Sequence, residues 1–166
     1  IPLPYECGTG TCGTCVARAK PGTIIENDVI LAGNRNLNKQ RGEFLLCQCE
    51  PLGDCDILVD TKALLDDSKS PLPKHFQGKL NNIQKVAPDV VTANLKLNST
   101  VNFIAGQFFL LKSQNVDGYR AYSMTNYDER KDELKFVIKK TEKGRFTNYL
   151  FANQREEIDL EVFGPL

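Results

Sequence analysis

The chain has 166 residues, of which 41% are hydrophobic, and its 21 Lys and Arg residues balance its 21 Asp and Glu residues. This length suits one domain or two small ones, and the balanced charge creates no overall field that would favour nucleic acid or an anionic membrane. No apolar run approaches the length of a membrane span. The start, Ile1-Pro2, shows neither an initiator Met nor a signal-peptide pattern, so we expect a fragment cut at both ends.

The cysteines are the first feature that indicates chemistry. Cys7, Cys12 and Cys15 are spaced C-x4-C-x2-C in a glycine-rich stretch, and Cys47 and Cys49 follow downstream. Three such thiols with a distant fourth are typical of the plant-type [2Fe-2S] cluster. The intervening glycines allow positive φ, so that backbone N–H groups can approach inorganic sulfur closely. The pattern predicts an electron carrier.

Two other uses of these thiols have to be weighed. Structural zinc usually takes paired C-x2-C knuckles, whereas the first pair here has four intervening residues and the later cysteines stand as C-x-C. A disulfide framework suits short secreted chains that lack a core, and this chain has enough apolar residues to build one. Cysteines kept as cluster ligands indicate a reducing compartment, so we expect a cytoplasmic protein.

The first sixty residues predict few regular elements. Alternation over 16–19 suggests a short strand, which the turn residues of 20–23 end. A short helix is expected within 28–37. The apolar run 44–46 would carry Cys47 into the interior, and residues 56–60 have the pattern of another strand.

This half of the chain resembles the ferredoxin domain of plant-type [2Fe-2S] proteins, in the motifs PYECGTGTCGTC and FLLCQCEPLGDCDILV. The resemblance implies a β-grasp domain over residues 1–64, here partial because nothing supplies the hairpin and helix that precede the loop in the family. It also implies four cluster ligands: Cys7, Cys12, Cys15 and Cys47. Cys49 and Cys55 match no ligand position, although Cys49 is the natural rival to Cys47.

Residues 65–75 are expected to form a linker. They are polar and carry two prolines, which disfavour a helix and give an extended connection. His75, the one histidine of the chain, ends this stretch. A surface or packing role is expected for it, rather than that of a ligand or proton shuttle.

The sequence of residues 76–166 has the pattern of β-strands separated by turns. Alternation or β-rich composition marks six runs: 78–86, 90–97, 107–112, 120–125, 134–140 and 158–162. They predict a six-stranded antiparallel β-barrel, so the whole chain is expected to be α+β and mainly β. Residues 144–153 break the pattern, because Phe146, Tyr149 and Leu150 recur at helical spacing.

Two motifs in this half point to a ligand. In the first, Arg120-Ala121-Tyr122-Ser123, a strand would place Arg120 and Tyr122 on one face and Ser123 on the other. A guanidinium suits a pyrophosphate because its donors form a rigid fork, and Tyr122 offers a flat face to an aromatic ring. Alone, this motif also fits an ordinary strand.

The second motif, Lys143-Gly144-Arg145-Phe146-Thr147, opens the expected helix. Free N–H groups at a helix start attract anions, and glycine leaves them accessible. A turn before a helix would explain the same glycine. Together the two motifs indicate a diphosphate attached to a planar ring.

Most of this half resembles the FAD-binding barrel of the ferredoxin–NADP reductase superfamily, in RAYSMTN, FVIKKTEKGRFTNYLF and EVFGPL. The resemblance implies that Arg120 contacts the FAD phosphates, that Tyr122 packs on the isoalloxazine, and that Ser123 lies near its N5 edge. It further implies that Val137, Ile138 and Lys139 line the flavin. Gly144 to Thr147 would supply the phosphate-binding backbone.

A ferredoxin domain followed by such a barrel resembles the reductase components of multicomponent bacterial oxygenases. The resemblance implies that electrons pass from NAD(P)H, through FAD, to a [2Fe-2S] cluster and on to an oxygenase or ferredoxin. The nicotinamide domain of that family would lie outside this sequence. No side chain is expected to act as an acid, base or nucleophile. The alternatives are another acceptor, as in a sugar-nucleotide reductase, or a non-redox zinc module.

Overall fold

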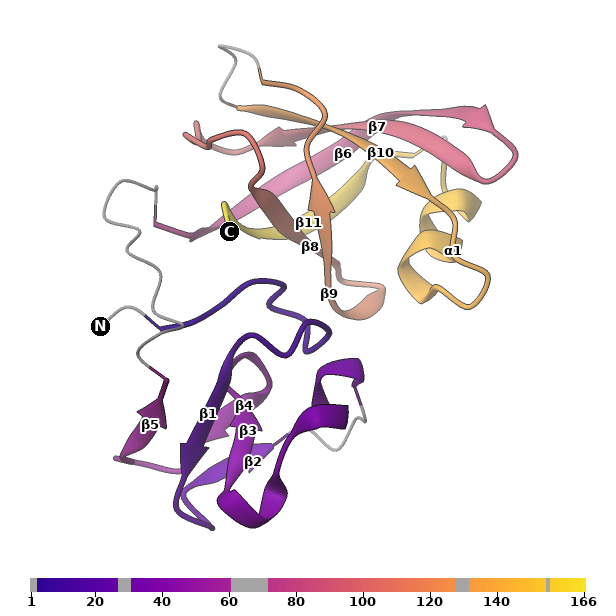
Figure 1. Cartoon of the computed structure of the whole chain (residues 1–166). Helices are drawn as coiled ribbons and strands as arrows, with labels where there is room; N and C mark the ends of the chain where they lie inside the picture. The colour runs from indigo at the N-terminus through magenta and orange to yellow at the C-terminus, as the bar shows by residue number, and fades with distance from the viewer. Residues whose placement is uncertain (1–2, 27–30, 61–71, 128–131, 155) are drawn as a thin grey trace. The chain divides into compact units, whose positions relative to one another are not determined.

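The structure is a computed structural model that describes residues 3–26, 31–60, 72–127, 132–154 and 156–166. The chain divides into two compact units, Ile1–Ser68 and Lys69–Leu166, and each has its own sheets (Figure 1). Within the described ranges, no helix has the length and apolar character needed to cross a bilayer.

The first unit contains two small antiparallel sheets. One has the strand order β3-β1-β5 and the other pairs β2 with β4. The strands are β1 (Val16–Ala19), β2 (Ile24–Glu26), β3 (Glu43–Leu45), β4 (Cys49–Pro51) and β5 (Ile57–Val59). Ala17 pairs with Phe44 on one side and with Val59 on the other. Both Ala17 and Phe44 are almost completely buried, so the centre of this sheet is a small core.

Three short 3₁₀ helices connect these strands: η1 (Ala32–Asn36), η2 (Lys39–Arg41) and η3 (Leu46–Gln48). The helix expected within 28–37 is therefore a single 3₁₀ turn in its described part, while residues 28–30 lie outside the described residues. The sequence of η1, Ala-Gly-Asn-Arg-Asn, explains this difference, because Gly and Asn are weak α-helix formers. The strand expected at 56–60 is β5.

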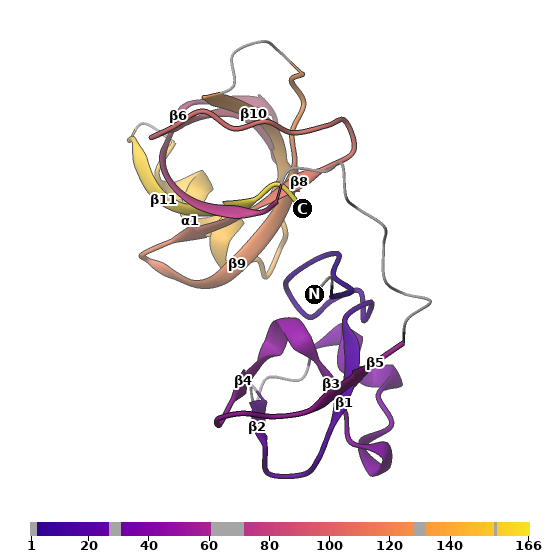
Figure 2. The ribbon, with the colours of Figure 1, turned by 90° about the vertical axis from the view of Figure 1, so that its left-hand side faces the viewer.

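The second unit is a single six-stranded sheet with the order β10-β7-β6-β11-β8-β9. All of its neighbouring strands are antiparallel. The strands are β6 (Lys74–Ala87), β7 (Val90–Leu97), β8 (Phe108–Ser113), β9 (Val116–Ser123), β10 (Glu133–Lys139) and β11 (Ile158–Gly164). The helix α1 (Arg145–Ala152) follows β10. Figure 2 shows the sheet curled around its own interior.

Alternate side chains along the strands show which face of the curled sheet is turned inward. Along β10, Leu134, Phe136 and Ile138 are buried, whereas the intervening residues are exposed. The same alternation runs along β7 and β11. Each strand therefore turns one apolar face inward, and the inward faces together form one core.

The two edge strands approach each other beyond the end of β9. The Thr125 N–H donates to the Lys135 carbonyl oxygen at 2.8 Å, and the Lys135 N–H donates to Asn126 Oδ1 at 2.8 Å. These contacts join the β9 end of the sheet to β10, although the two strands are not paired in a ladder. The expected six-stranded antiparallel arrangement is confirmed, in the form of a curled sheet joined at this seam.

Two strands are longer than the sequence pattern suggested. Strand β6 begins at Lys74, so Lys74 and His75 belong to a strand, and the His75 ring lies 4.6 Å from the Phe163 ring. Strand β9 begins at Val116 rather than 120 because it pairs with β8 directly from the turn. Residues 65–71 of the expected linker lie outside the described residues.

Strand β10 offers a direct test of the alternation. Leu134→Ala should lower the free energy of unfolding by about 2–5 kcal/mol, because Leu134 is fully buried in the core. Val137→Ala is the matched control on the same strand, where the side chain is 52% exposed, and should change stability by no more than about 0.5 kcal/mol. Urea unfolding of the full chain, followed by circular dichroism, measures both. Equal losses would contradict the assigned faces.

Candidate functional site

The first candidate site is the loop that carries Cys7, Cys12 and Cys15. Three backbone N–H groups donate to Cys7 Sγ: those of Thr9 at 3.4 Å, Thr11 at 3.3 Å and Cys12 at 3.4 Å. A loop wrapped around a sulfur in this way places a set of N–H dipoles where a negatively charged sulfur is stabilised.

A close contact between the backbones of the cysteine loop and η1 holds this loop in place. Gly10 has φ +73°, and a Cβ on it would lie 2.3 Å from Leu31 Cδ1. The Gly33 N–H, in η1, donates to the Gly10 carbonyl oxygen at 2.9 Å, and a Cβ on Gly33 would lie 2.7 Å from that oxygen. The segment η1 therefore supports the cysteine loop through backbone contacts that leave no room for a side chain.

The sheet brings the fourth thiol to this loop. Strand β3 pairs with β1 so that Leu45 faces Val16, and η3 follows with Cys47. As a result, Cys47 Sγ lies 3.3 Å from Cys15 Sγ. Two sulfurs on one tetrahedral metal ion, each bonded at about 2.3 Å, would lie about 3.8 Å apart. The pair therefore needs only a small adjustment to share an ion.

The thiol pKa values differ within this group. Burial raises the pKa of Cys7, but hydrogen bonds from Cys12 and Thr9 outweigh it and bring the value to about 7. The hydrogen bond from Cys15 lowers the pKa of Cys47 to about 6 against the effect of burial, and that same bond raises the pKa of Cys15. Thiolates are the metal-binding form, so the lowered pKa values of Cys7 and Cys47 favour metal binding by these two residues.

The rival thiol, Cys49, is directed elsewhere. It lies on β4 opposite Glu26, and its Sγ donates weakly to the Leu46 carbonyl oxygen at 3.5 Å. Burial raises the pKa of Cys49. The structure thus places Cys47, and not Cys49, against Cys15. Cys55 is partly buried and carries no disulfide.

Across the described residues, no three His, Cys, Asp or Glu side chains gather at a position for one metal ion. A two-iron cluster divides its four thiolates between two metal ions. The arrangement it requires is therefore pairs of thiols, such as Cys15 with Cys47, rather than one group of three or four.

The second candidate site lies in the other unit, where β9, β10 and α1 meet. The Tyr122 ring, on β9, is 6.4 Å from the Phe136 ring on β10 in an edge-on contact. It is also 5.8 Å from the Phe146 ring on α1. One aromatic side chain therefore joins the three segments that contain the predicted flavin residues.

Arg120 is held by its own strand. Its Nη1 donates to the Tyr119 carbonyl oxygen at 2.8 Å, and Gly118, at φ +82°, leaves room for it, because a Cβ there would lie 3.0 Å from Nη1. The other guanidinium donors have no partner within the described part of the chain. Arg120 thus keeps most of its fork available to an anion.

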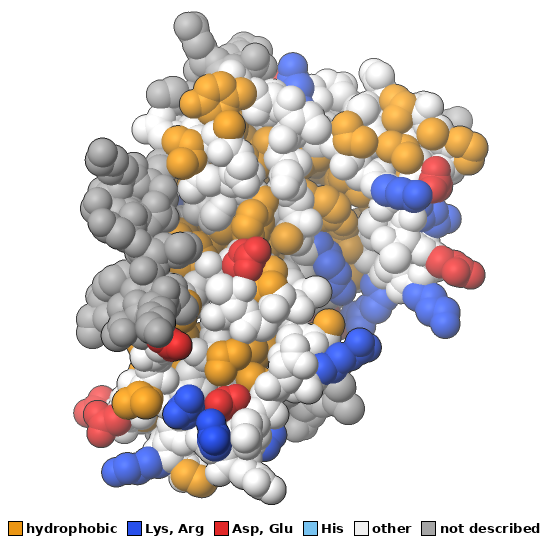
Figure 3. All heavy atoms as spheres, in the orientation of Figure 1, with side chains coloured by type: hydrophobic (Ala, Val, Ile, Leu, Met, Phe, Trp, Pro, Cys, Tyr) orange, Lys and Arg blue, Asp and Glu red, His pale blue; other side chains and the backbone are white. Residues whose placement is uncertain are grey.

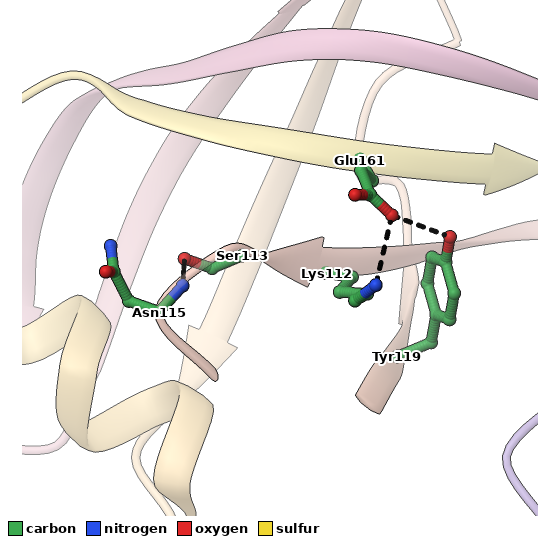
Figure 4. Close-up of polar contacts among 5 residues, drawn as sticks. All are labelled: Lys112, Ser113, Asn115, Tyr119 and Glu161. Atoms are coloured by element: carbon green, nitrogen blue, oxygen red, sulfur yellow. Dashed lines mark hydrogen bonds and ion pairs between the residues drawn. The ribbon is translucent and has the colours of Figure 1, made fainter. Parts of the chain in front are cut away.

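The strand carrying Arg120 is anchored from its outer face. The Tyr119 hydroxyl donates to Glu161 Oε2 at 3.2 Å, and Lys112 Nζ donates to the same oxygen at 3.3 Å (Figure 4). This network spans β9, β8 and β11. At the turn between β8 and β9, the Asn115 N–H donates to Ser113 Oγ at 3.2 Å (Figure 4).

The burial of the first motif follows the expected alternation. Arg120 and Tyr122 are partly buried, whereas Ala121 and Ser123 are exposed. Burial raises the pKa of Tyr122 to about 12, so the phenol stays neutral at physiological pH. Its hydroxyl makes no hydrogen bond to another described residue. Tyr122 therefore acts as an apolar ring in this structure.

The predicted residues of β10 lie on two different faces. Val137 and Lys139 are exposed, and Lys139 Nζ pairs with Asp89 at 3.5 Å. Ile138 is completely buried in the core. Only the backbone of Ile138 can therefore reach a ligand on the strand surface.

The second motif forms the start of α1. Gly144 is the N-cap residue, and no side chain caps the helix. Arg145 is exposed and pairs with Asp117 at 2.9 Å, whereas Phe146 and Thr147 are buried. The Thr147 hydroxyl is already bonded within the preceding loop. Sequence reasoning missed Asp117 and Thr141, because their partners are set by the fold and not by spacing.

The surface around α1 carries charges of both signs. Figure 3 shows blue and red side chains over this helix and the loop before it. Four exposed cations come from this stretch: Lys139, Lys140, Lys143 and Arg145. Lys139 pairs with Asp89 and Arg145 with Asp117, whereas Lys140 and Lys143 have no ion-pair partner among the described residues and suit an anionic ligand.

Two cavities of this unit lie away from these residues. One of about 480 Å³ is lined by Gln77, Lys79, Lys96 and Asp159 among others. A smaller one of about 150 Å³ lies between the Phe103–Gln107 loop and Met124–Tyr127, just past β9. Neither includes Arg120, Tyr122 or Gly144. The predicted flavin residues therefore lie outside both of these cavities, at the seam where β9, β10 and α1 meet.

Comparison with known proteins matches both units to families. Residues 77–166 match the oxidoreductase FAD-binding domain, and residues 1–52 match the 2Fe-2S iron-sulfur cluster binding domain. Both resemblances seen in the sequence are thus confirmed, and the cofactors that they imply are FAD and a [2Fe-2S] cluster.

Two relatives that match along the whole chain are named as reductases. The ferredoxin–NAD(P)(+) reductase CarAd of Metapseudomonas resinovorans is 30% identical, over 100% of this chain and 50% of its own length. The reductase component of the naphthalene 1,2-dioxygenase system of Pseudomonas putida is 28% identical, over 100% of this chain and 48% of its own.

A solved structure, the ferredoxin reductase in carbazole 1,9a-dioxygenase, aligns with a TM-score of 0.83 and 28% identity, covering 100% of this chain and 49% of that one. The chain thus spans about half the length of the curated relatives it matches. With a family model matched over more than half of its residues, this chain belongs to the family of oxidoreductase FAD-binding domains and carries, before that domain, a 2Fe-2S iron–sulfur cluster binding domain.

Proposed function

We propose that this chain is the part of a reductase that carries FAD and a [2Fe-2S] cluster, and that the whole protein passes electrons from NAD(P)H to an oxygenase or ferredoxin. The observation that carries the proposal is the presence, in one chain, of a thiol loop with a fourth thiol beside it and of a seam built for an anionic flavin. The names of the relatives support the direction of transfer.

The donor set of the thiol loop fits an iron–sulfur cluster. We assign Cys7, Cys12, Cys15 and Cys47 as its ligands. The N–H groups that now donate to Cys7 Sγ, together with that of Thr14, which donates to Cys12 Sγ at 3.4 Å, would stabilise charge on the cluster sulfurs. Hydrogen bonds of this kind tune the reduction potential of such clusters.

The seam in the second unit fits FAD. Arg120 would bind the diphosphate with its free donors, and the uncapped start of α1 would add backbone N–H groups from Arg145 onward. The Gly144 N–H is already bonded to the Thr141 carbonyl oxygen. Tyr122 would pack against the isoalloxazine, with Ala121 and Ser123 at its edge. Val137, the Ile138 backbone and Lys139 would line the flavin along β10.

Bound FAD supplies the step between two-electron and one-electron chemistry, and a bound cluster supplies one-electron transfer. The side chains described here need perform no acid, base or nucleophilic step. Their tasks are to hold the diphosphate, to orient the ring and to surround the thiolates with N–H donors.

The proposal is tested by reconstituting the protein with iron, sulfide and FAD. We expect about two iron atoms and one FAD per chain, with visible absorption from both, and bleaching of this absorption on anaerobic reduction. A colourless protein that takes up zinc would favour the non-redox alternative. A coloured protein whose full-length form reduces a small-molecule substrate directly, and no oxygenase or ferredoxin, would show that the acceptor is wrong.

The ligand assignment predicts different effects for two neighbouring cysteines. Cys47→Ser should reduce the cluster absorbance and iron content to a small residue, because Cys47 lies beside Cys15. Cys49→Ser is the control and should largely retain both, because Cys49 is directed to a backbone carbonyl. Equal loss in the two variants would refute the assignment.

The flavin assignment predicts a selective effect for Arg120→Ala. Loss of charge-assisted hydrogen bonds to the diphosphate should weaken FAD binding by about 10- to 100-fold, while the iron content stays unchanged. Lys79→Ala is the control, because it removes an exposed cation whose neighbours on the adjacent strands are Lys96 and Asp159 and not predicted flavin residues. Flavin fluorescence titration measures both variants, and unchanged FAD affinity in Arg120→Ala would contradict the assignment.

A further inference from the structure

One buried hydroxyl closes the loop between β10 and α1. Thr147 is 5% exposed, and its Oγ1 accepts a hydrogen bond from the Thr141 N–H at 3.1 Å. The same hydroxyl lies 3.2 Å from the Gly144 carbonyl oxygen, to which it donates. A backbone hydrogen bond from the Gly144 N–H to the Thr141 carbonyl oxygen, at 2.9 Å, completes the loop.

This hydroxyl also explains the glycine. Gly144 has φ −78°, an ordinary value for any residue, so backbone strain does not require glycine there. A Cβ at Gly144 would instead lie 2.5 Å from Thr147 Oγ1 and 2.9 Å from Thr141 Cβ. The space that a side chain would occupy at Gly144 is filled by the Thr147 hydroxyl.

The hydrogen bonds leave this hydroxyl no donor for a ligand. A threonine hydroxyl has one hydrogen and two acceptor lone pairs. The hydrogen is directed to a backbone carbonyl oxygen of the loop, that of Gly144 at 3.2 Å or that of Thr141 at 3.5 Å. One lone pair receives the Thr141 N–H. The remaining lone pair would repel a phosphate oxygen. Thr147 can therefore bind a diphosphate only by giving up the loop.

We infer that Thr147 is a positioning residue: its hydroxyl holds Thr141 to Gly144, so that the N–H groups at the start of α1 are fixed before the cofactor binds, and the hydroxyl does not itself contact the FAD diphosphate. This inference rests on the proposed FAD site. It changes the role of one residue there from a cofactor contact to the support of the contacts made by others.

The test compares Thr147→Val, which keeps the shape but removes the hydroxyl, with Thr147→Ser, which keeps the hydroxyl. Thr23→Val, in the other unit, is the control, because its hydroxyl likewise donates to a carbonyl oxygen three residues back, that of Lys20 at 2.7 Å. We expect FAD binding about tenfold weaker in Thr147→Val. The Ser variant and the control should stay within about threefold of the parent.

Amide hydrogen exchange at Thr141, measured with and without FAD, separates positioning from direct contact. If the hydroxyl keeps its bond to the Thr141 N–H, that N–H is protected from exchange in the parent both with and without FAD, and it exchanges faster in Thr147→Val. If the hydroxyl moved to the phosphate, FAD binding would expose the Thr141 N–H, and the inference would be overturned. Unchanged FAD affinity in Thr147→Val would overturn it as well.

The thermal midpoint of each flavin-free variant shows whether a loss of FAD affinity only reflects a loss of folding. Two results together would overturn the inference in favour of a general packing role. They are a thermal midpoint of Thr147→Val far below that of the parent, and weak FAD binding in Thr147→Ser as well. A parent protein that binds no FAD would instead refute the proposed function. The two failures are therefore distinguishable.

Discussion

The contact of the Tyr122 ring with Phe136 and Phe146 is the interaction on which the second unit's site depends. Strands β9 and β10 lie at opposite ends of the hydrogen-bonded order of the sheet, so no ladder aligns them. Curling of the sheet brings these ends together, and the aromatic contacts then fix β9, β10 and α1 against one another. Arg120 is two residues from this ring, and Arg145 is next to Phe146. The packing of these rings therefore sets the positions of the proposed diphosphate contacts.

In the first unit, backbone pairing brings together thiols that are far apart in the chain. Cys15 ends the local loop, whereas Cys47 comes from a distant segment. The pairing of β1 with β3 places Val16 opposite Leu45, and the Leu46 N–H donates to the Cys15 carbonyl oxygen at 3.0 Å. In both units a short functional motif is completed by a partner far away in the chain, and a sheet supplies the link.

The cysteine loop and most of the strands could be predicted from the sequence, because residue spacing and hydrophobic alternation are properties of short segments. The cysteine spacing indicated the loop, and the strand expected at 90–97 is β7. The alternation of Leu134, Phe136 and Ile138 could also have shown that Ile138 faces the core, although the family resemblance placed it at the flavin. The hydrogen bonds of Thr147 and the turn of Arg120 toward the Tyr119 carbonyl were beyond reach, since they depend on side-chain torsions and on loops closed by tertiary contacts.

The backbone contact between Gly10 and Gly33 makes the cysteine loop sensitive to a residue that lies outside it. Gly33 contributes no thiol, yet its N–H donates to the carbonyl oxygen of Gly10 in that loop, and a Cβ on Gly33 would lie 2.7 Å from the same oxygen. A methyl group added at Gly33 would therefore push the cysteine loop aside and disturb the hydrogen bonds on which the midpoint potential of the proposed cluster depends.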